Sequence, residues 1–477
     1  MGEAARTSRL NAAILKVSGL FGGLQVTNIL CPVVRAKLVA VWIGAAGMGL
    51  FGIFNTAIEM LTSLSLFGLR ESAVRSVAQT RKEKISETVR VVRRCALVLG
   101  LAGMILTIAL SGVLSRISFD NYSYTWAFMA LSSVVLMSVL NAGESAVFQG
   151  LQRYRKLAYC SMAGSVGGLA VSIPMFYFWR IDSIVPSIIA YSLITWIALG
   201  LYREKLEPGG EELSVRRTVQ LGKKMLSLGF YLTVTGFVAN AISYAMMAWL
   251  NNYAGTDAAG YYQAGFTLVN RYVGLVFTAI SMEYYPRLSS VEKSARRIST
   301  FVSNQMFMLL SLLVPLVIVF ICCSELMVTI LYTSDFHVMV PFIILAATGT
   351  VLRGISWCMA FVILAKGDGR TFLVTEVLSG IISIILNIVC YIRWGFMGLG
   401  FAYIGWYLCY TLIVGVVYFN RYRLDINRAV LPFAVYSFAI CGFAAWIGLN
   451  FSVYLTLPLA AIAGVVSLRV LKRKVRK

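Results

Sequence analysis

Long apolar stretches, each close to the length of a membrane-spanning helix, follow one another along the whole chain. The hydrocarbon core of a bilayer takes about 20 consecutive apolar residues per helix. By that measure the pattern predicts about 14 helices and therefore an all-α polytopic membrane protein. The expected spans are 11–34, 42–69, 95–115, 124–148, 158–178, 185–202, 226–250, 260–282, 301–323, 341–365, 372–392, 399–419, 431–450 and 453–469.

Two of these stretches resemble each other, which indicates an internal duplication. Trp42–Arg75 and Ala254–Arg287 both combine a glycine-containing helix entry, a polar mid-helix position and a basic exit. Aligned on their glycines, they set Glu59 opposite Asn270. The segment Arg203–Met225, between the sixth and seventh spans, has the Glu, Pro and Gly content of a solvated linker. We therefore predict two six-helix lobes, followed by a C-terminal helix pair with a basic tail, at 1–205, 206–425 and 426–477.

The composition agrees with membrane insertion, and the distribution of basic residues indicates the orientation of the chain in the membrane. Of all residues, 59% are hydrophobic and 13% are charged, with a mean hydropathy of +0.79, beyond the range of soluble domains. The formal charge of +22 would suit nucleic-acid binding, but most basic residues lie in segments on one side of the predicted topology. The few on the other side are Arg35, Lys37, Arg116, Arg180 and Arg393. The positive-inside rule thus accounts for the charge, predicts cytoplasmic termini and argues against a nucleic-acid partner.

The sequence offers no arrangement of residues that would support catalysis. The nine cysteines lie within or at the ends of apolar runs, which favours packing over disulfide or metal roles. His337 is the only histidine, and Lys366–Arg370 is interpreted as an inner turn rather than a phosphate cradle. The predicted outer loops are short, and only Ser324–Val340 has room for a surface helix. We expect a protein that is not an enzyme, with no catalytic residue, metal or cofactor.

Several polar side chains are predicted inside the membrane, where a charge costs about 2.5–3.5 kcal/mol. Arg271 and Arg353 lie near the middle of their spans, and Lys16 lies nearer the inner margin. An arginine cannot lose its charge, so each needs an anion, a carboxylate or water. Candidate counter-ions or ion-coupling groups are Glu59, Glu144 and Glu376. Candidate amides of a polar lumen are Asn55, Asn141, Gln263, Asn270 and Asn387. Interhelical hydrogen bonding is the alternative for these amides, and for the acids both pairing and coupling stay open.

Three segments carry a resemblance to a known family. GAAGMGLFGIF at Gly44–Phe54 resembles the opening of the second helix in bacterial O-antigen translocases of the Wzx type. Gly255–Arg287, with its Tyr-Pro-Arg exit, resembles their eighth helix, and AKGDGRTFLVTE at Ala365–Glu376 resembles their tenth-to-eleventh connection. The match extends loosely over most of the chain and depends on the order of the motifs. It indicates the multidrug/oligosaccharidyl-lipid/polysaccharide exporter superfamily.

The resemblance implies a flippase that moves an undecaprenyl-diphosphate-linked oligosaccharide, such as an O-antigen repeat unit, across the bacterial inner membrane by alternating access. Movement would run from the cytoplasmic to the periplasmic leaflet, coupled to an ion gradient or the membrane potential. Partners would be membrane lipids, a polysaccharide polymerase and chain-length machinery. Arg271, Arg353 and Lys16 would bind the diphosphate, and the amides would bind the sugars.

Two alternatives to this function stay open. A multidrug or other lipid-linked precursor exporter of the same superfamily would share the fold, although the first span here carries Lys16 and no acid. A polysaccharide polymerase is disfavoured by the short outer loops. The sequence leaves the sugar, the coupling ion and the oligomeric state undetermined.

Overall fold

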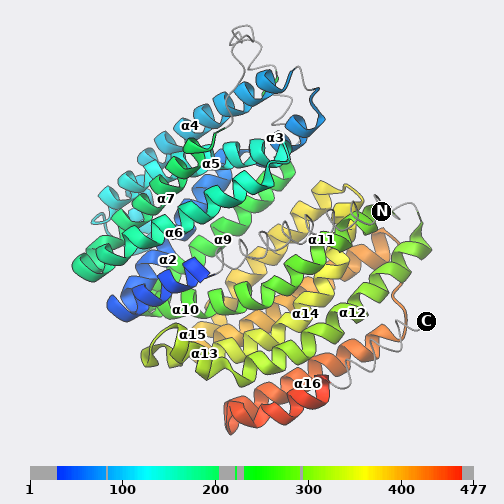
Figure 1. Ribbon diagram of the computed structural model, residues 1–477. Coiled ribbons are helices and arrows are strands. Elements are labelled where there is room, and N and C mark those ends of the chain that lie inside the picture. Colours follow the sequence, from blue (N-terminus) through cyan, green and yellow to red (C-terminus); the bar gives the residue numbers. More distant parts are fainter. Residues whose placement is uncertain (1–29, 82–83, 204–220, 223–229, 291–293, 465–477) are drawn as a thin grey trace, which may run out of the picture. The chain divides into compact units, whose positions relative to one another are not determined.

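Helices joined by short connections make up almost all of the described chain (Figure 1). The structure is a computed structural model, and it describes residues 30–81, 84–203, 221–222, 230–290 and 294–464. Within these residues no strand forms. The predicted all-α polytopic fold is confirmed. Contacts between residues divide the chain into two compact units, Met1–Ala259 (unit 1) and Gly260–Lys477 (unit 2).

Unit 1 contains a helical segment at 30–42 and the helices α2 (Ala45–Leu66), α3 (Leu69–Gln79), α4 (Ile85–Phe119), α5 (Thr125–Gly150), α6 (Tyr154–Trp179), η2 (Arg180–Ser183), α7 (Ile184–Leu201) and α9 (Phe230–Ala254). The main contacts join α4 to α5, α6 to α7, and α2 to α9. A Cβ on Gly103 of α4 would lie 2.2 Å from Ser65 Oγ of α2. One on Gly168 of α6 would lie 2.3 Å from the Tyr191 ring of α7. The absence of a side chain at these glycines therefore permits close helix contact.

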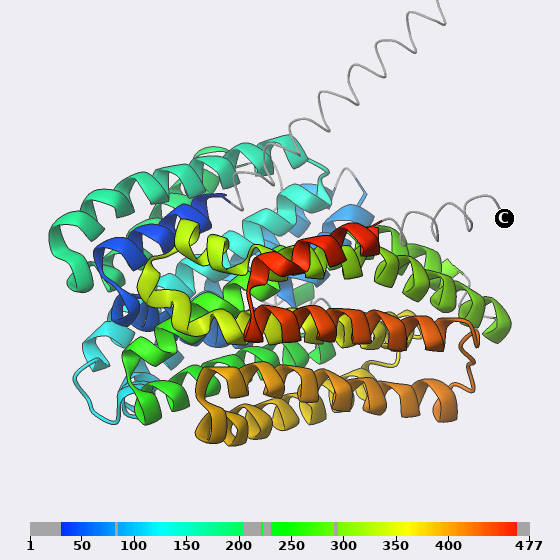
Figure 2. The ribbon, with the colours of Figure 1, turned by 90° about the horizontal axis from the view of Figure 1, so that it is seen from below.

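Unit 2 contains α10 (Thr256–Leu268, which begins in unit 1), η3 (Val269–Val273), α11 (Gly274–Ser290), α12 (Ala295–Cys322), α13 (Ser324–Leu331), η4 (Ser334–Met339), α14 (Val340–Ala365), α15 (Gly369–Val416), η5 (Val417–Arg421), α16 (Val430–Asn450) and η6 (Val453–Thr456). The mostly buried α14 packs along α12, α15 and α16. Gly395 (φ 57°, ψ −137°) interrupts α15 in a conformation that favours glycine. The chain turns back there, since Trp406 Nε1 donates to Ser379 Oγ at 2.8 Å. Figure 2 shows α16 beside the helical residues 457–464, both in red.

Most predicted spans coincide with observed helices. Within the described residues, nine helical elements are long and apolar enough to cross a membrane. Two of these, Tyr154–Leu201 and Gly369–Arg421, each hold two predicted spans, because only the short helix η2 separates α6 from α7 and because α15 reverses at Gly395. The compact units divide at Ala259, beyond the predicted lobe boundary at 205, because α9 packs on α2 and α4. The predicted duplication itself stays a prediction.

Three local features near the start of the chain differ from the prediction. The prediction of an outer loop between the first two spans is wrong, because residues 30–42 are helical and Arg35 is buried. Helix α4 begins at Ile85 rather than near residue 95, and α3 was not predicted. Hydropathy reports the apolar part of a helix, so it misses turns that continue into water and short polar helices. Most of the first predicted span, with Lys16, lies outside the described residues.

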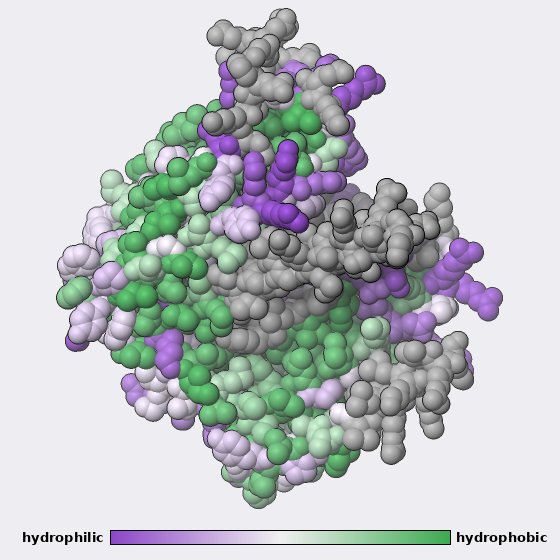
Figure 3. Space-filling model, viewed as in Figure 1, coloured by the Kyte–Doolittle hydropathy of each residue, from purple (hydrophilic) through white to green (hydrophobic). Residues whose placement is uncertain are grey.

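The exposed surface of the helices is suited to lipid. The visible face in Figure 3 is largely apolar, and hydrophilic residues gather around α3 and the start of α4. On α4, Val98 is 65% exposed and Ile105 is 63% exposed. Apolar exposure on this scale is expected where side chains face the bilayer. The chain is thus a multi-pass membrane protein, while the inner membrane and the cytoplasmic termini stay predictions.

The predicted turn at Lys366–Arg370 joins α14 to α15. Asp368 caps α15 by accepting hydrogen bonds from the backbone N–H of Thr371 at 3.1 Å and from its hydroxyl at 2.8 Å. Asp368 also accepts from the Tyr422 hydroxyl at 3.0 Å and pairs with Arg421 at 2.9 Å. The carboxylate therefore fixes the turn to the end of η5.

We expect Asp368→Ala to lower stability at neutral pH by about 1 kcal/mol, the usual contribution of an N-cap. Burial alone raises the pKa of Asp368, but the hydrogen bonds from Thr371 and Tyr422 and the charge of Arg421 lower it below its ordinary value. A lowered folded-state pKa stabilises above the unfolded-state pKa, and the effect disappears as pH falls through the folded-state pKa. Thermal melts of wild type and variant in detergent should differ at pH 7 and approach each other in acid. Identical melting temperatures at pH 7 would contradict the capping role.

Candidate functional site

The first candidate site lies inside unit 2, around the guanidinium of Arg353 on α14. Its Nη1 donates to Asn270 Oδ1 at 2.7 Å and, more weakly, to the Tyr403 hydroxyl at 3.4 Å. The ring centroids of Phe277 and Tyr407 lie 5.1 Å and 5.8 Å from the guanidinium carbon, within cation–π range. The π-helical turn η3 positions Asn270, and such turns frequently occur at functional sites.

The partners of Arg353 are all neutral. Among the residues that the structure describes, none forms an ion pair with it. Its hydrogen bonds use Nη1, which leaves the Nε and Nη2 donors for another acceptor. An arginine in an apolar span keeps its charge, and such a charge is normally compensated by an anion or a polar cavity. The geometry therefore favours binding of an anionic group.

An acid lies further along the same interior, on α15. Glu376 accepts a hydrogen bond from the Tyr410 hydroxyl. The ring centroids of Tyr403 and Tyr407 are 4.9 Å apart, and those of Tyr407 and Tyr410 are 6.5 Å apart. A row of aromatic rings thus connects the arginine to the carboxylate. Cation, aromatic faces and acid together can contact a ligand that has both an anionic and a polyhydroxyl part.

The other residues predicted for unit 2 are not all brought to Arg353. Asn387 donates to the backbone oxygen and hydroxyl of Ser383 on its own helix, at 2.8 Å and 3.2 Å. Gln263 is half-buried on α10. Arg271 follows Asn270 in η3, but its side chain lies outside the described part of the chain. Of the three cations predicted to bind a diphosphate, the structure describes the side chain of Arg353 alone.

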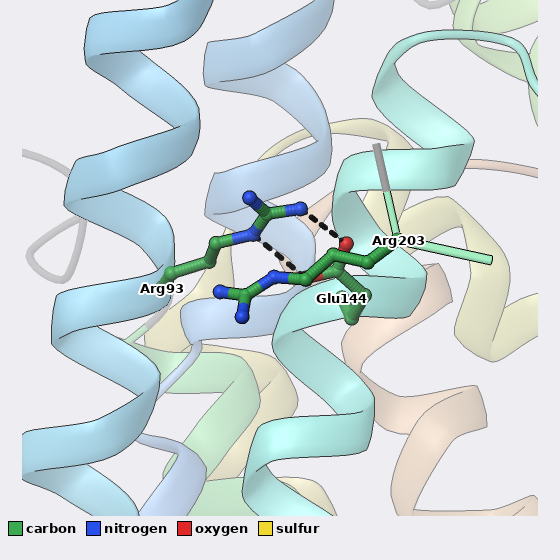
Figure 4. A network of polar contacts seen from close by, with 3 residues as sticks. All are labelled: Arg93, Glu144 and Arg203. Atoms are coloured by element: carbon green, nitrogen blue, oxygen red, sulfur yellow. Dashed lines mark hydrogen bonds and ion pairs between the residues drawn. The ribbon is translucent and has the colours of Figure 1, made fainter. Parts of the chain in front are cut away.

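The second candidate site lies in unit 1, where α4, α5 and the end of α7 meet (Figure 4). The buried Glu144 accepts from Arg93 Nε at 2.9 Å and from Arg93 Nη2 at 2.6 Å. Arg203, just beyond α7, brings its Nε to 3.6 Å from the same carboxylate. A cavity of about 90 Å³ adjoins the three side chains and is also lined by Asn141. Two predicted residues, Glu144 and Asn141, therefore lie together, and the acid is paired.

The sequence does not single out Arg93 or Arg203, because both fall outside the predicted spans. The signal in the sequence is their position, since Arg93 lies two residues before Cys95, where the apolar run begins, and Arg203 lies two residues after Leu201, where α7 ends. A basic residue at the edge of an apolar run lies near the membrane surface. Polar residues in the last turns of neighbouring helices lie at the same depth in the membrane, so the two can pair. Hydropathy alone does not tell which neighbours these are.

Two further predicted residues lie on α2. Asn55 Nδ2 donates to the backbone oxygen of Phe51 at 2.6 Å, within the same helix. Glu59 is exposed within unit 1, and its backbone oxygen accepts from Asn240 Nδ2 at 3.4 Å. Glu59 is not among the residues that line the cavity beside Glu144.

A buried arginine that the sequence placed in an outer loop also lies in unit 1. Arg35 is 7% exposed, and its Nη2 donates to Ser187 Oγ at 3.3 Å. The rings of Phe51 and Tyr191 both lie 4.8 Å from its guanidinium carbon. Cation–π contacts with both ring faces join the 30–42 segment to α2 and α7. We assign Arg35 a structural role.

The chain has multiple apolar spans, and its helical units contain charged and aromatic clusters. These features place it in the class of polytopic membrane proteins with internal polar sites. The sequence matches the family model described as polysaccharide biosynthesis protein over residues 39–341. The chain belongs to this family. No curated protein matches the sequence.

Solved structures with the same fold include flippases and exporters. The inward closed conformation of the lipid II flippase MurJ is 12% identical with a TM-score of 0.69, covering 95% of this chain and 99% of that one. An inward-facing multidrug resistance MATE family transporter of the MOP superfamily is 11% identical with a TM-score of 0.68, covering 84% and 95%. An outward-facing transporter of that family is 14% identical with a TM-score of 0.53, covering 84% and 92%. These matches establish the fold, and together with the family match they support the resemblance to Wzx-type translocases that the sequence shows.

Proposed function

We propose that this protein is a flippase for an undecaprenyl-diphosphate-linked oligosaccharide, with an O-antigen or related repeat unit as its substrate. The main support for the proposal is the environment of Arg353. This permanent cation lies in an apolar helix, and its hydrogen-bond partners are neutral. A guanidinium binds phosphate oxygens through charge-assisted, paired hydrogen bonds. The neighbouring tyrosine rings offer flat faces and hydroxyl groups to sugars.

Family and fold support the same substrate class. The matched family is one of polysaccharide biosynthesis, and one structure with this fold is named as a flippase of lipid II. In this proposal the protein lies in the bacterial inner membrane with cytoplasmic termini. It moves the glycolipid outward by alternating access and supplies a polymerase with its chain-length machinery.

Reconstitution tests the proposal directly. Purified protein in proteoliposomes should move a labelled undecaprenyl-diphosphate oligosaccharide between leaflets, measured as the fraction of glycan reached by an external, non-permeant glycosidase. Protein-free vesicles give the baseline. Accessibility equal to that baseline would contradict the proposal. Transport of a cationic dye without the glycolipid would favour the drug exporter, an alternative supported by the likeness to the multidrug transporters.

We further propose that Glu376 couples transport to proton movement. Glu376→Gln keeps a hydrogen-bond acceptor for Tyr410 but cannot take up a proton. We therefore expect the variant to lose the acceleration that a pH gradient gives to wild type. Glu283→Gln is the matched control, because Glu283 is an exposed acid on α11 that pairs with Arg287 of that helix. Wild-type transport that is indifferent to pH, sodium gradient and membrane potential would contradict any coupling role for Glu376 or Glu59.

A further inference from the structure

Among the described residues, the cluster in unit 1 brings two guanidinium groups to one carboxylate. Both carboxylate oxygens of Glu144 are engaged by Arg93, at 2.6 Å and 2.9 Å. Arg203 has only the 3.6 Å approach to the same group. The side chains of Arg93 and Glu144 are 12% and 10% exposed, whereas that of Arg203 is 52% exposed. One carboxylate thus faces two guanidinium groups, and Arg203 is the less neutralised of the two.

The electrostatic environment of Arg203 favours an additional anion. Burial, and then the positive charge of Arg93, lower the pKa of Arg203, while Glu144 acts in the opposite direction. The two arginines therefore repel each other more than the shared carboxylate compensates at Arg203. An anion placed between them would relieve this repulsion.

The adjoining cavity has room and polarity for a ligand. Its volume is about 90 Å³, and a water molecule needs roughly 10–15 Å³ on this measure. Asn141 Oδ1 is buried and has no hydrogen-bond partner among the described residues, so the cavity offers an acceptor beside the two cations. Gly200 also lines the cavity, and a Cβ placed on it would meet no atom within 4 Å. A phosphate with a neighbouring hydroxyl group matches these features.

The cavity lies at the depth of lipid headgroups. Arg93 lies two residues before the apolar part of α4, and Arg203 lies two residues after the end of α7. Trp196, another lining residue, is 43% exposed, and tryptophan is enriched at membrane–water interfaces. The bias of basic residues assigns this end of the helices to the cytoplasmic side. Basic pockets between membrane helices on that side are known to bind anionic headgroups.

We propose that this cavity binds the phosphate of a membrane lipid, with the phosphate between Arg93 and Arg203 and a headgroup hydroxyl donating to Asn141 Oδ1. Phosphatidylglycerol and a polyprenyl-diphosphate sugar both carry this chemistry. A choline or ethanolamine headgroup brings a cation, which the guanidinium groups of Arg93 and Arg203 would repel. The site does not depend on the proposed transport function, because an ordinary phospholipid satisfies it.

Native mass spectrometry of the full-length protein in detergent tests the proposal. With equal amounts of phosphatidylglycerol and phosphatidylcholine, the wild type should retain phosphatidylglycerol preferentially. Arg203→Ala should weaken that binding about fivefold, the effect of one basic residue near anionic lipid. Gly200→Leu should weaken it as well, by filling the cavity without a change of charge. Arg155→Ala, at an exposed arginine on α6, is the matched control and should bind as wild type does.

A second titration with undecaprenyl diphosphate distinguishes the two sources of lipid phosphate. Binding that depends on Arg203 and Gly200 for either lipid supports the site and identifies which lipid occupies it. Lipid retention that is equal in wild type, Arg203→Ala and Gly200→Leu, with unchanged melting temperatures, would overturn the proposal. These readouts need no transport, so a failed flippase assay leaves them interpretable.

Discussion

Arg353→Gln should abolish translocation of the lipid-linked glycan while the protein stays folded in the membrane. Glutamine still donates a hydrogen bond to Asn270 but carries no charge. A hydrogen bond to a charged group contributes about 1.5–3 kcal/mol, so diphosphate binding should weaken by about 10- to 100-fold. The measurement is surface polysaccharide in cells that depend on this protein, together with the proteoliposome assay.

Two further substitutions make the result specific to the guanidinium. Arg353→Lys keeps the charge but loses the planar paired donors, so we expect partial activity. Tyr403→Phe removes the 3.4 Å hydrogen bond but keeps the aromatic ring and the guanidinium, so its loss of activity should be much smaller than that of Arg353→Gln. Normal surface polysaccharide in Arg353→Gln cells would refute a role in binding the diphosphate.

The stability of Arg353→Gln separates a binding role from a structural one. No described residue forms an ion pair with Arg353, so its removal leaves no carboxylate without a partner. Loss of a poorly compensated charge from an apolar helix also removes a desolvation penalty. The melting temperature should therefore be equal to or higher than that of wild type. A large drop would indicate that Arg353 mainly holds helices together.

The sequence was sufficient to predict the membrane spans, because an apolar run of about 20 residues matches the thickness of the bilayer core. It also placed Arg353 and Asn270 inside the membrane. It did not predict that they bond to each other, since they are 83 residues apart and hydropathy carries no information on which helices pack together.

The partner of Glu144 shows the same limit. The sequence left both pairing and ion coupling open for this acid, and the structure supplies a partner, Arg93, which is 51 residues away on the part of α4 that extends beyond its apolar run. Arg35 was misplaced for a related reason. In the sequence, a charged residue beside an apolar run indicates the end of a span. The aromatic rings that bury Arg35 come from distant parts of the chain, so the sequence pattern does not reveal them.

Glu144→Ala should destabilise the protein by about 3 kcal/mol or more, the usual cost of removing one partner of a buried ion pair. The variant would remove the carboxylate that accepts both hydrogen bonds from the largely buried Arg93. The matched control is Glu283→Ala, which breaks the exposed pair of Glu283 and Arg287 on one helix, with a distance of 2.6 Å. An exposed pair of this kind contributes only about 0.3–0.5 kcal/mol, so the control should melt close to wild type.

A double-mutant cycle identifies the origin of that loss. Replacing both Arg93 and Glu144 with methionine removes the charge pair and keeps side-chain volume in the contact between α4 and α5. Because Glu144→Met alone would take away the carboxylate that pairs with the largely buried Arg93, the double variant Arg93→Met/Glu144→Met should be more stable than the single variant Glu144→Met. The measurement is thermal unfolding of all variants in one detergent. If the losses of the single variants simply added in the double variant, the pair would not be coupled, and the stability of the α4–α5 contact would have to come from apolar packing alone.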